Sequence, residues 1–200
     1  LLPSWDDITA DKLNYARSFN VQQQNMDPIT GHRLVEPYPN SVYVVQNPPS
    51  ATLSTDEMDE VAELPYARDW HPDYAAGGVP AFAEIKFSIS SNRGCFGECS
   101  FCALTFHQGR VLQMRSHDSI MREAELLTRD PEFKGYINDV GGPTANFSRP
   151  ACDKQLKHGV CKNKRCLWPS VCKNMVVDES GYTQLLRDLR QLPGVKKVFV

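Results

Sequence analysis

The 200 residues of this chain are enough for one domain with a substantial hydrophobic core. Hydrophobic residues make up 41% of the sequence and charged residues 23%, an ordinary balance that excludes a disordered chain. No apolar stretch is long enough to span a bilayer, and the net charge of −2 argues against a surface that binds nucleic acid over its whole extent. The N-terminus lacks a basic region before an apolar one, so we expect no signal peptide and a cytoplasmic protein.

Residues 1–80 are expected to form an irregular arm that packs on a core rather than an independent domain. Residues 4–25 have a rough apolar stripe and a candidate N-cap at Ser4, which together predict a helix. The rest of the arm is rich in Pro, Asn and Gly, with a short strand predicted at 41–45. A helix is predicted at 55–64, where acidic residues crowd the first turns and suit the helix dipole.

From residue 81 onward, predicted strands alternate with predicted helices. The strands are expected at 85–90, 136–140 and 195–200, and the helices at 117–129 and 181–192. Ser116 is the expected cap of the first helix, and Pro193-Gly194 is expected to end the second. This β-α-β-α-β order predicts an α/β fold with a parallel sheet. The chain lacks an initiating Met and stops inside the last strand, so we expect it to be a piece of a longer protein.

The seven cysteines fall into two groups, three near the middle of the chain and four within residues 150–175. In a chain without a secretion signal, this grouping favours metal ligation in a reducing compartment over a framework of disulfides.

The first group consists of Cys95, Cys99 and Cys102, which have the spacing C-x3-C-x2-C. A cubane iron–sulfur cluster normally takes four thiolates, one for each iron. Three ligands on one short loop would leave the fourth iron open, as catalytic metal sites keep one position free. Gly94 and Gly97 would allow the backbone to wrap closely around such a cluster.

At these cysteines the chain resembles the radical S-adenosylmethionine (radical SAM) superfamily, whose defining motif is C-x3-C-x2-C. Further segments resemble the YgiQ family within that superfamily, and the likeness covers most of residues 40–175. These segments are residues 46–49, 64–66, 101–104, 107–110 and 139–146.

The resemblance implies a partial (β/α) barrel, of which residues 81–200 would form the N-terminal half with a Cys-rich insertion at 150–175. It also implies a [4Fe-4S] cluster on the three cysteines and S-adenosylmethionine (SAM) on the open iron. Reduction would cleave SAM to a 5′-deoxyadenosyl radical that abstracts hydrogen from a substrate, which is unknown. An electron donor such as flavodoxin or ferredoxin would be needed. Active sites in such barrels lie at the C-terminal ends of the strands.

Three residues would contact SAM if the resemblance holds. Phe101 matches the position whose aromatic ring lies by the adenine, although a core Phe is the alternative. Gly141 and Gly142 match the motif whose backbone receives the methionine amino group. Pro143 replaces the usual glutamate there, so a contact through that side chain is lost. A tight turn after a strand is the alternative interpretation of the two glycines.

Three further polar residues follow the cysteine loop. His107 could hydrogen-bond a cluster sulfide or the cofactor, although a structural donor is the more common role of such a histidine. Arg110 or Arg115 could hold the SAM carboxylate through a bidentate contact. Solvated or helix-capping arginines are the alternative.

The second cysteine group, with the spacing C-x8-C-x4-C-x5-C, would complete a closed site with no open position. Its members are Cys152, Cys161, Cys166 and Cys172. Lysines and arginines crowd the same segment and would offset the charge of four thiolates around a zinc ion or a second iron–sulfur cluster. RNA binding by this basic segment is a further alternative, with Trp168 as its one aromatic platform.

The sequence thus favours a radical SAM enzyme acting on an unknown substrate. One alternative is an iron–sulfur electron-transfer or scaffold protein, although electron carriers normally ligate every iron. The other is a zinc-dependent nucleic-acid binding module centred on residues 152–173. No membrane partner is expected.

Overall fold

The computed structural model describes residues 1–142 and 146–200 and divides the chain into two compact units. The first unit contains residues 1–52, 96–111 and 150–175, and the second contains residues 53–95, 112–149 and 176–200. The predicted division into an arm of residues 1–80 and a core of residues 81–200 stays a prediction, and the compact units follow other boundaries. Within the described residues, no helix has the length and apolar character needed to cross a membrane.

The first unit begins with two short helices, α1 (Trp5–Ala10) and α2 (Lys12–Gln24), where one helix is predicted. Ser4 caps α1 as expected: its hydroxyl accepts from the Asp7 N–H at 3.1 Å, and the Asp7 carboxylate accepts from the Ser4 N–H at 3.0 Å. Asp11 separates the helices because it has an extended backbone (φ −140°) and its side chain caps α2 instead. The single continuous helix is therefore wrong, and the cap at Ser4 is confirmed.

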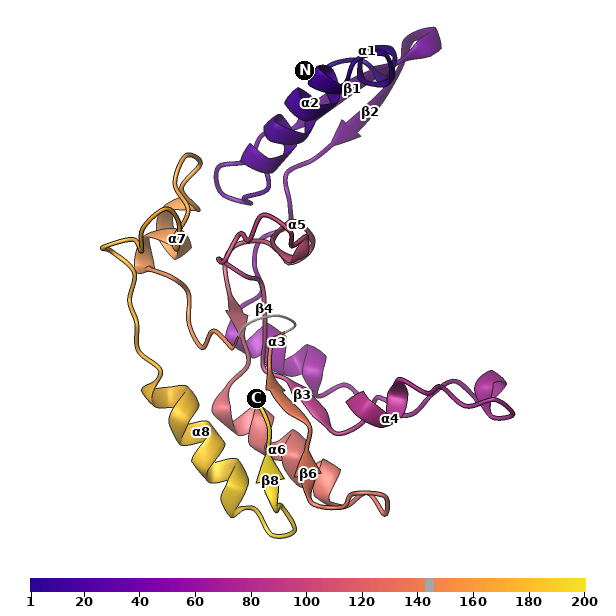
Figure 1. Cartoon of the computed structure of the whole chain (residues 1–200), viewed down its shortest axis with the longest axis vertical. Coiled ribbons are helices and arrows are strands. Elements are labelled where there is room, and N and C mark those ends of the chain that lie inside the picture. Colours follow the sequence, from indigo (N-terminus) through magenta and orange to yellow (C-terminus); the bar gives the residue numbers. More distant parts are fainter. Residues whose placement is uncertain (143–145) are drawn as a thin grey trace. The chain divides into compact units, whose positions relative to one another are not determined.

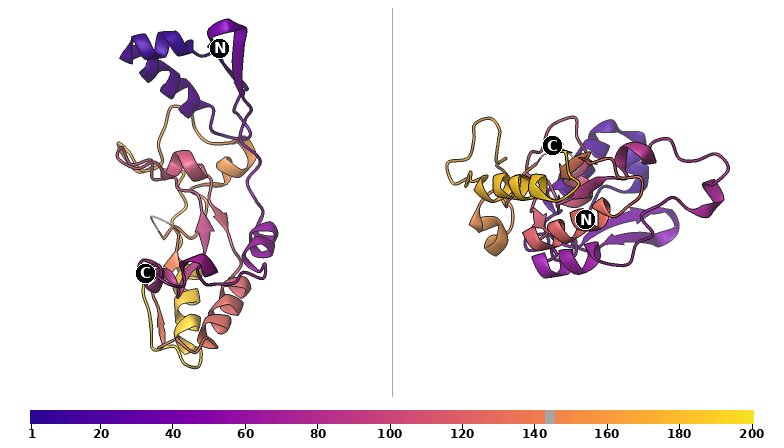
Figure 2. Two further views of the ribbon diagram at one scale, coloured as in Figure 1. Left: turned by 90° about the vertical axis from the view of Figure 1, so that its right-hand side faces the viewer. Right: turned by 90° about the horizontal axis from the view of Figure 1, so that it is seen from below.

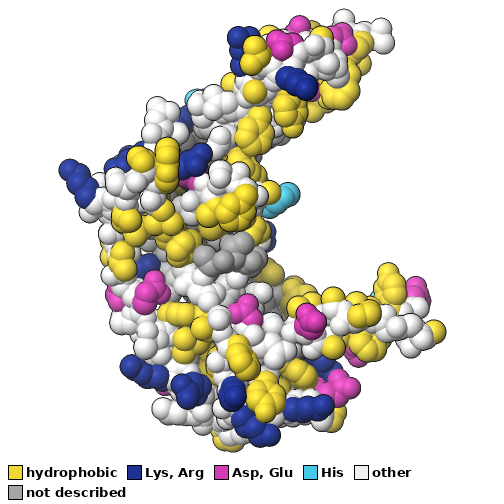
Figure 3. Space-filling model, viewed as in Figure 1, with side chains coloured by type: hydrophobic (Ala, Val, Ile, Leu, Met, Phe, Trp, Pro, Cys, Tyr) yellow, Lys and Arg dark blue, Asp and Glu magenta, His cyan; other side chains and the backbone are white. Residues whose placement is uncertain are grey.

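An antiparallel hairpin follows, formed by β1 (Leu34–Tyr38) and β2 (Val42–Gln46). The sequence predicts only the second strand, because Pro37 lies within the first and argues against a strand there. The turn at Pro39–Ser41 (η1) holds Asn40 and Ser41 at φ values of 61° and 57°. All five residues of β2 are exposed, and hydrophobic side chains gather on the surface around this hairpin (Figure 3).

Asp27 joins the chain after α2 to the Cys-rich segment, which carries the helix α7 (Asp153–His158). Its carboxylate accepts from the N–H groups of Ile29 and Thr30 at 2.9 and 2.7 Å and from that of Val160 at 3.0 Å. Gly159 has a φ of 74°, and a Cβ there would lie 2.4 Å from an Asp27 oxygen. Only glycine therefore fits against this carboxylate. The unit also contains a short helix, α5 (Leu104–Gln108).

The second unit combines short strands with helices, as labelled in Figure 1. Its helical elements are α3 (Thr55–Ala62), η2 (Pro72–Tyr74), α4 (Phe82–Ile85), α6 (His117–Thr128) and α8 (Ser180–Gln191). Its strands are β3 (Ser88–Ser90), β4 (Asn92–Arg93), β5 (Gln113–Met114), β6 (Tyr136–Ile137), β7 (Asp139–Gly141) and β8 (Lys197–Val198).

The strand pairing confirms a parallel arrangement. β3 pairs in parallel with β7, and β6 pairs in parallel with β8, so the chain from β6 to β7 lies between the other two strands. Asn138 separates β6 from β7, and its N–H donates to the Phe87 carbonyl at 2.9 Å. β4 and β5 form a separate antiparallel pair. The described residues thus form an α/β fold without a closed barrel.

The core of the second unit lies between the strands and the helices α6 and α8, which lie on one side of them (Figures 1 and 2). The buried residues are Ile89, Ile120, Ala124, Leu127, Ile137, Val140, Leu185 and Leu189. The predicted apolar faces of both helices are therefore confirmed, as is the cap of α6, where the Ser116 hydroxyl accepts from the Ser119 N–H at 3.0 Å.

The predicted strand at 85–90 is wrong in its first half. Phe82–Ile85 forms the helical turn α4, and the strand begins only at Ser88. Ile85 is 62% exposed, so burial does not hold it in a strand. Apolar alternation over such a short segment does not distinguish one helical turn from one strand.

Arg115 is buried and ties the end of β3 to the start of α6. Its Nη1 donates to the Ser90 carbonyl at 3.1 Å and also contacts the Glu123 carboxylate. Its Nε and Nη2 donate to the Ser119 hydroxyl at 3.2 and 2.9 Å. The Arg115 side chain is therefore engaged in the protein interior rather than solvated.

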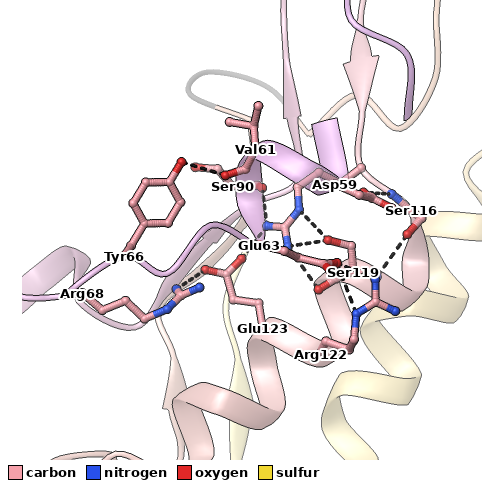
Figure 4. A network of polar contacts seen from close by, with 11 residues as sticks. Asp59, Val61, Glu63, Tyr66, Arg68, Ser90, Ser116, Ser119, Arg122 and Glu123 are labelled. Carbon is pink, nitrogen blue, oxygen red and sulfur yellow. Dashed lines mark hydrogen bonds and ion pairs between the residues drawn. The ribbon is translucent and has the colours of Figure 1, made fainter. Parts of the chain in front are cut away.

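Ion pairs and hydrogen bonds extend this network over α6 (Figure 4). The Glu123 carboxylate also pairs with Arg68. The helix α3 is held to α6 because the Asp59 carboxylate accepts from the Ser116 N–H at 2.8 Å and because Glu63 pairs with Arg122. The half-buried Glu123 carboxylate is thus shared by two guanidinium groups, which compensates its partial loss of hydration.

We predict that Arg115→Ala lowers the free energy of unfolding by about 3–5 kcal/mol, because it removes one partner of a buried ion pair and several hydrogen bonds. Arg129→Ala is the matched control, since Arg129 is 72% exposed and lies 3.9 Å from Glu125. It should change the free energy of unfolding by less than about 0.5 kcal/mol. Equal urea midpoints for the two variants would contradict the structural role of Arg115.

Tyr182 in α8 donates a hydrogen bond from its hydroxyl to the Val140 carbonyl at 2.5 Å. Burial, with the charges of Asp139 and Glu179, raises the pKa of Tyr182 from 10.0 to about 12. The folded chain therefore keeps a proton that the unfolded chain loses, so this stabilisation is present below about pH 10 and is lost as the pH rises towards about 12.

We predict that the free energy of unfolding falls between about pH 10 and 12 and that Tyr182→Phe removes the part of this fall due to Tyr182. Tyr182→Phe should also cost about 1 kcal/mol at neutral pH, because the hydrogen bond is lost. Denaturant titrations at several pH values test both effects. A variant with the same alkaline dependence as the original chain would refute the assignment.

Candidate metal centre

The first part of the cysteine loop follows the strands of the second unit. After β3 the chain forms β4, whose Asn92 and Arg93 pair with Met114 and Gln113. Gly94 then adopts a φ of 89°, which favours glycine as expected. The turn leads to Cys95, which is 8% exposed. The first cysteine is therefore positioned by the ends of two strands.

The second part of the loop belongs to the first unit and bends at Glu98, which has a φ of 48°. This positive φ falls on Glu98 rather than on the expected Gly97, and the surroundings hold it in place. The Glu98 carboxylate lies 2.8 Å from Arg110 Nη2, and Arg165 Nη1 donates to the Glu98 carbonyl at 3.3 Å. Burial raises the pKa of Glu98, while the charges of Arg110 and Arg165 oppose this shift.

Cys99 and Cys102 come directly after this bend. Cys99 is exposed and Cys102 is half-buried, and the Cys102 N–H donates to the Cys99 carbonyl at 3.0 Å. The division between the units falls between Cys95 and Phe96, so Cys95 belongs to the second unit, and Cys99 and Cys102 belong to the first. Within residues 1–142 and 146–200, no three His, Cys, Asp or Glu side chains come together in a way that could hold a metal ion. The fit of a cluster to this loop therefore rests on its donors, which are three thiols in one short loop.

Gly141 and Gly142 lie at the C-terminal end of β7, beside the end of β3. The Gly141 carbonyl accepts from the Ser91 N–H at 2.9 Å. A Cβ on Gly142 would lie 2.5 Å from Asn92 Nδ2, so the absence of a side chain leaves room for this amide. Asn92 is 2% exposed, and its Nδ2 has no hydrogen-bond partner among the described residues. A buried donor beside two glycines suits the recognition of a bound molecule.

The aromatic residue within the cysteine motif is not part of a core. Phe101 is 90% exposed, so the alternative of a core Phe is wrong. His107 lies in the last turn of α5 and is exposed. Pro143, at the position of the glutamate that the resemblance would lead us to expect, lies outside the described residues. The roles of Phe101, Gly141 and Gly142 in binding SAM stay predictions.

Arg110 links the cysteine loop to the Cys-rich segment within the first unit. Its Nη1 donates to the Cys161 carbonyl at 2.8 Å, and its Nη2 donates to the Lys164 carbonyl at 3.1 Å. With the ion pair to Glu98, the Arg110 guanidinium therefore links the cysteine loop to the backbone of the Cys-rich segment. Sequence reasoning missed this role, because the partners lie far from Arg110 along the chain and follow no periodic pattern.

The second cysteine group lies entirely in the first unit, and its four thiols are half-buried and not joined in disulfides. Lys154 Nζ donates to the Cys161 sulfur at 3.5 Å, and Gln155 Nε2 donates to the Cys166 sulfur at 3.8 Å. The Cys172 N–H donates to the Cys166 carbonyl at 2.8 Å. Donors to sulfur of this kind stabilise thiolates.

The charges of Cys152 and Cys172 act on the Cys166 thiol, so these three thiols influence one another. Burial raises the pKa of Cys166, an effect that Arg110 opposes and that Cys152 and Cys172 reinforce. The backbone N–H of Asn174 lowers the pKa of Cys172, with a further contribution from Lys164. The expected proximity of cationic side chains to this group is thus confirmed at Lys154 and Lys164.

The chain is similar to known proteins over part of its length and over all of it. Residues 1–88 match the family model described as Radical SAM N-terminal. Over its 200 residues the chain is 56% identical to a UPF0313 protein of Clostridium botulinum (strain Okra / Type B1), and it spans 31% of that relative's length. It is 54% identical over 201 residues to a UPF0313 protein of Clostridium perfringens (strain SM101 / Type A), of which it spans 30%.

The chain is thus similar to radical SAM proteins over residues 1–88 and to UPF0313 proteins over its whole length, as its likeness to the YgiQ family within the radical SAM superfamily predicts.

Proposed function

We propose that the protein is a radical SAM enzyme in which Cys95, Cys99 and Cys102 hold a [4Fe-4S] cluster whose fourth iron binds SAM. The observation that carries this proposal is the set of three thiols that follows the C-terminal ends of the strands, where the sites of (β/α) folds lie. Three thiolates leave one iron without a protein ligand. The match to the Radical SAM N-terminal family supports the same chemistry.

Bound cluster and SAM together would supply one-electron reductive cleavage of the carbon–sulfur bond, which yields methionine and a 5′-deoxyadenosyl radical. The chain's own residues bind and orient the cofactor. Asn92 offers a buried N–H donor to an acceptor group of SAM, and Gly142 keeps the space in front of it open. Phe101 offers an exposed aromatic face to the adenine. The Arg115 guanidinium already donates to Ser90 and Ser119 in the protein interior, so it is not proposed to hold the SAM carboxylate.

The second cysteine group is proposed to hold a zinc ion or a second iron–sulfur cluster. This proposal rests on the donor set, since no described group of thiols is gathered around a metal position. Four half-buried thiols in one unit, with hydrogen-bond donors directed at two of them, are the ligands that a closed site without an open position needs. A reducing cytoplasmic location and an electron donor such as flavodoxin or ferredoxin complete the proposal, because both thiol groups must stay reduced.

We predict that replacing Cys95, Cys99 or Cys102 with Ala abolishes formation of 5′-deoxyadenosine from SAM, because each change removes one of three ligands. The assay is anaerobic, with dithionite as reductant and chromatographic detection of the product. Ser100→Ala is the matched control, since Ser100 is exposed within the same loop. It should keep full iron content and activity. Cleavage that survives in any of the three cysteine variants would refute the proposed cluster site.

We predict that Gly142→Ala weakens SAM binding about tenfold or more, because the added Cβ displaces the Asn92 amide and removes one hydrogen bond to a charged ligand. Equilibrium dialysis with the reconstituted protein measures this change. The iron content and the thermal unfolding of Gly142→Ala should equal those of the original chain, which shows that the fold and the cluster are intact.

Gly181→Ala is the control for the previous variant. A Cβ on Gly181 meets no atom within 4 Å, and the residue lies in α8. It should leave SAM binding unchanged and stabilise the fold by about 1 kcal/mol through helix propensity. Unchanged SAM affinity in Gly142→Ala would rule out the proposed role of Asn92 and Gly142.

A further inference from the structure

A cavity of about 380 Å³ lies within the first unit and is not used by the proposed SAM chemistry. Its walls come from the end of α2 and the following loop, from α5, and from residues 160–169 of the Cys-rich segment. This volume falls in the range of small-molecule sites in proteins. All the residues that line the cavity belong to one unit, so the cavity is formed by that unit alone.

Three buried charged groups line the cavity: Asp27, whose carboxylate already accepts from backbone N–H groups, and the pair of Glu98 and Arg110. The side chains of Glu98 and Arg110 are 7% and 13% exposed, and they form an ion pair at 2.8 Å. Glu98 Oε2 nevertheless accepts no hydrogen bond with good geometry from the described residues, and Arg110 Nε donates none to them. Buried polar atoms in native proteins normally find a partner. Acceptor and donor together match the edge of a nucleobase, which offers amino groups and ring nitrogens.

The cavity also has aromatic walls. Trp168 is 65% exposed, and the Arg165 guanidinium lies 5.8 Å from the centre of its ring. Phe106 lines the same cavity and packs against Phe19, with ring centres 5.2 Å apart. Exposed aromatic rings beside arginine are the usual platforms on which unpaired bases stack.

Besides Arg110, three cations line the cavity, namely Lys162, Lys164 and Arg165. Lys164 acts on the Cys172 thiol, so it belongs with the second cysteine group. Lys162 and Arg165 have other contacts: Lys162 Nζ donates to the Thr30 carbonyl at 3.1 Å, and Arg165 donates to the Glu98 carbonyl at 3.3 Å. The Lys162 contact is with a neutral carbonyl group, and no described carboxylate pairs with its ammonium. The Arg165 charge acts on the Glu98 carboxylate, which Arg110 also pairs with, so these two cations face one negative charge. A phosphate group would supply the missing negative charge.

We propose that this cavity binds a nucleotide unit, with its base against Trp168 and Phe106, the base edge at Glu98 and Arg110, and its phosphate at Lys162 and Arg165. The nucleotide could be a free mononucleotide or one residue of single-stranded RNA, which share this chemistry. The inference goes beyond the proposed SAM cleavage and does not depend on it, since binding needs neither a reduced cluster nor turnover.

The test measures binding of 5′-AMP, adenosine and a fluorescent octaadenylate RNA to the full chain reconstituted with its metals. We expect 5′-AMP to bind at least about tenfold more tightly than adenosine, because the phosphate meets two cations. An octamer that binds at least tenfold more tightly than 5′-AMP identifies RNA as the source of the nucleotide, and equal affinities identify the free mononucleotide. If neither 5′-AMP nor the RNA binds while SAM cleavage is intact, the nucleotide inference is overturned and the proposed function is not affected.

Variants locate the binding in the cavity. Trp168→Ala should weaken 5′-AMP binding about fivefold or more, since base stacking is lost. Its control is Tyr74→Ala, because Tyr74 is 58% exposed in the second unit. Lys162→Gln should weaken binding about threefold. Its control is Lys157→Gln, because Lys157 is exposed in α7 of the same segment and does not line the cavity.

Metal content and thermal unfolding of each variant confirm that the fold is intact. Four results would overturn the inference: no binding of 5′-AMP or RNA at millimolar concentration, equal affinities for 5′-AMP and adenosine, equal effects of Lys157→Gln and Lys162→Gln, or displacement of 5′-AMP by SAM. The last result would assign the cavity to the adenosine of SAM rather than to a separate nucleotide.

Discussion

The second unit depends on one buried guanidinium, that of Arg115. It fixes the end of β3 to the first turn of α6 through the Ser90 carbonyl and the Ser119 hydroxyl, and it shares the Glu123 carboxylate with Arg68. A buried charge is stable only with such complete pairing. Because β3 leads through β4 to Cys95, the same contacts also set where the cysteine loop begins. The pairing of β3 with β7 then places Gly141 and Gly142 beside that point.

The cysteine loop has a second set of anchors in the first unit. Glu98, between Cys95 and Cys99, is held by Arg110 through its carboxylate and by Arg165 through its carbonyl. Arg110 in turn holds two backbone carbonyls of the Cys-rich segment. The two cysteine groups are therefore connected through the guanidinium groups of Arg110 and Arg165. A change at Arg110 would act on both groups, although it is a ligand in neither.

Local signals in the sequence predicted what local interactions determine. The caps at Ser4 and Ser116, the apolar faces of α6 and α8, and the parallel pairing all follow from short patterns. The break at Asp11 was missed because aspartate reads equally well as a helix residue or as a cap. The strand β1 was missed because of Pro37.

For the candidate site, the thiols and the two glycines could be named as candidates from the sequence alone. The role of Asn92 and the pairing of Glu98 with Arg110 could not be predicted, because both depend on contacts between residues that are distant along the chain. The burial of Arg115 likewise requires Ser90, Ser119 and Glu123 to come together in space. A charge pattern along the chain does not contain that information.

The central claim is that the loop of Cys95, Cys99 and Cys102 holds a cluster with one iron open to SAM. The most direct measurement is the EPR spectrum of the anaerobically reconstituted and reduced protein, recorded before and after addition of SAM, with iron and zinc counted on the same sample. The account predicts at least about four irons per chain and a signal that changes when SAM binds. An iron-loaded protein whose spectrum is the same with and without SAM would contradict it.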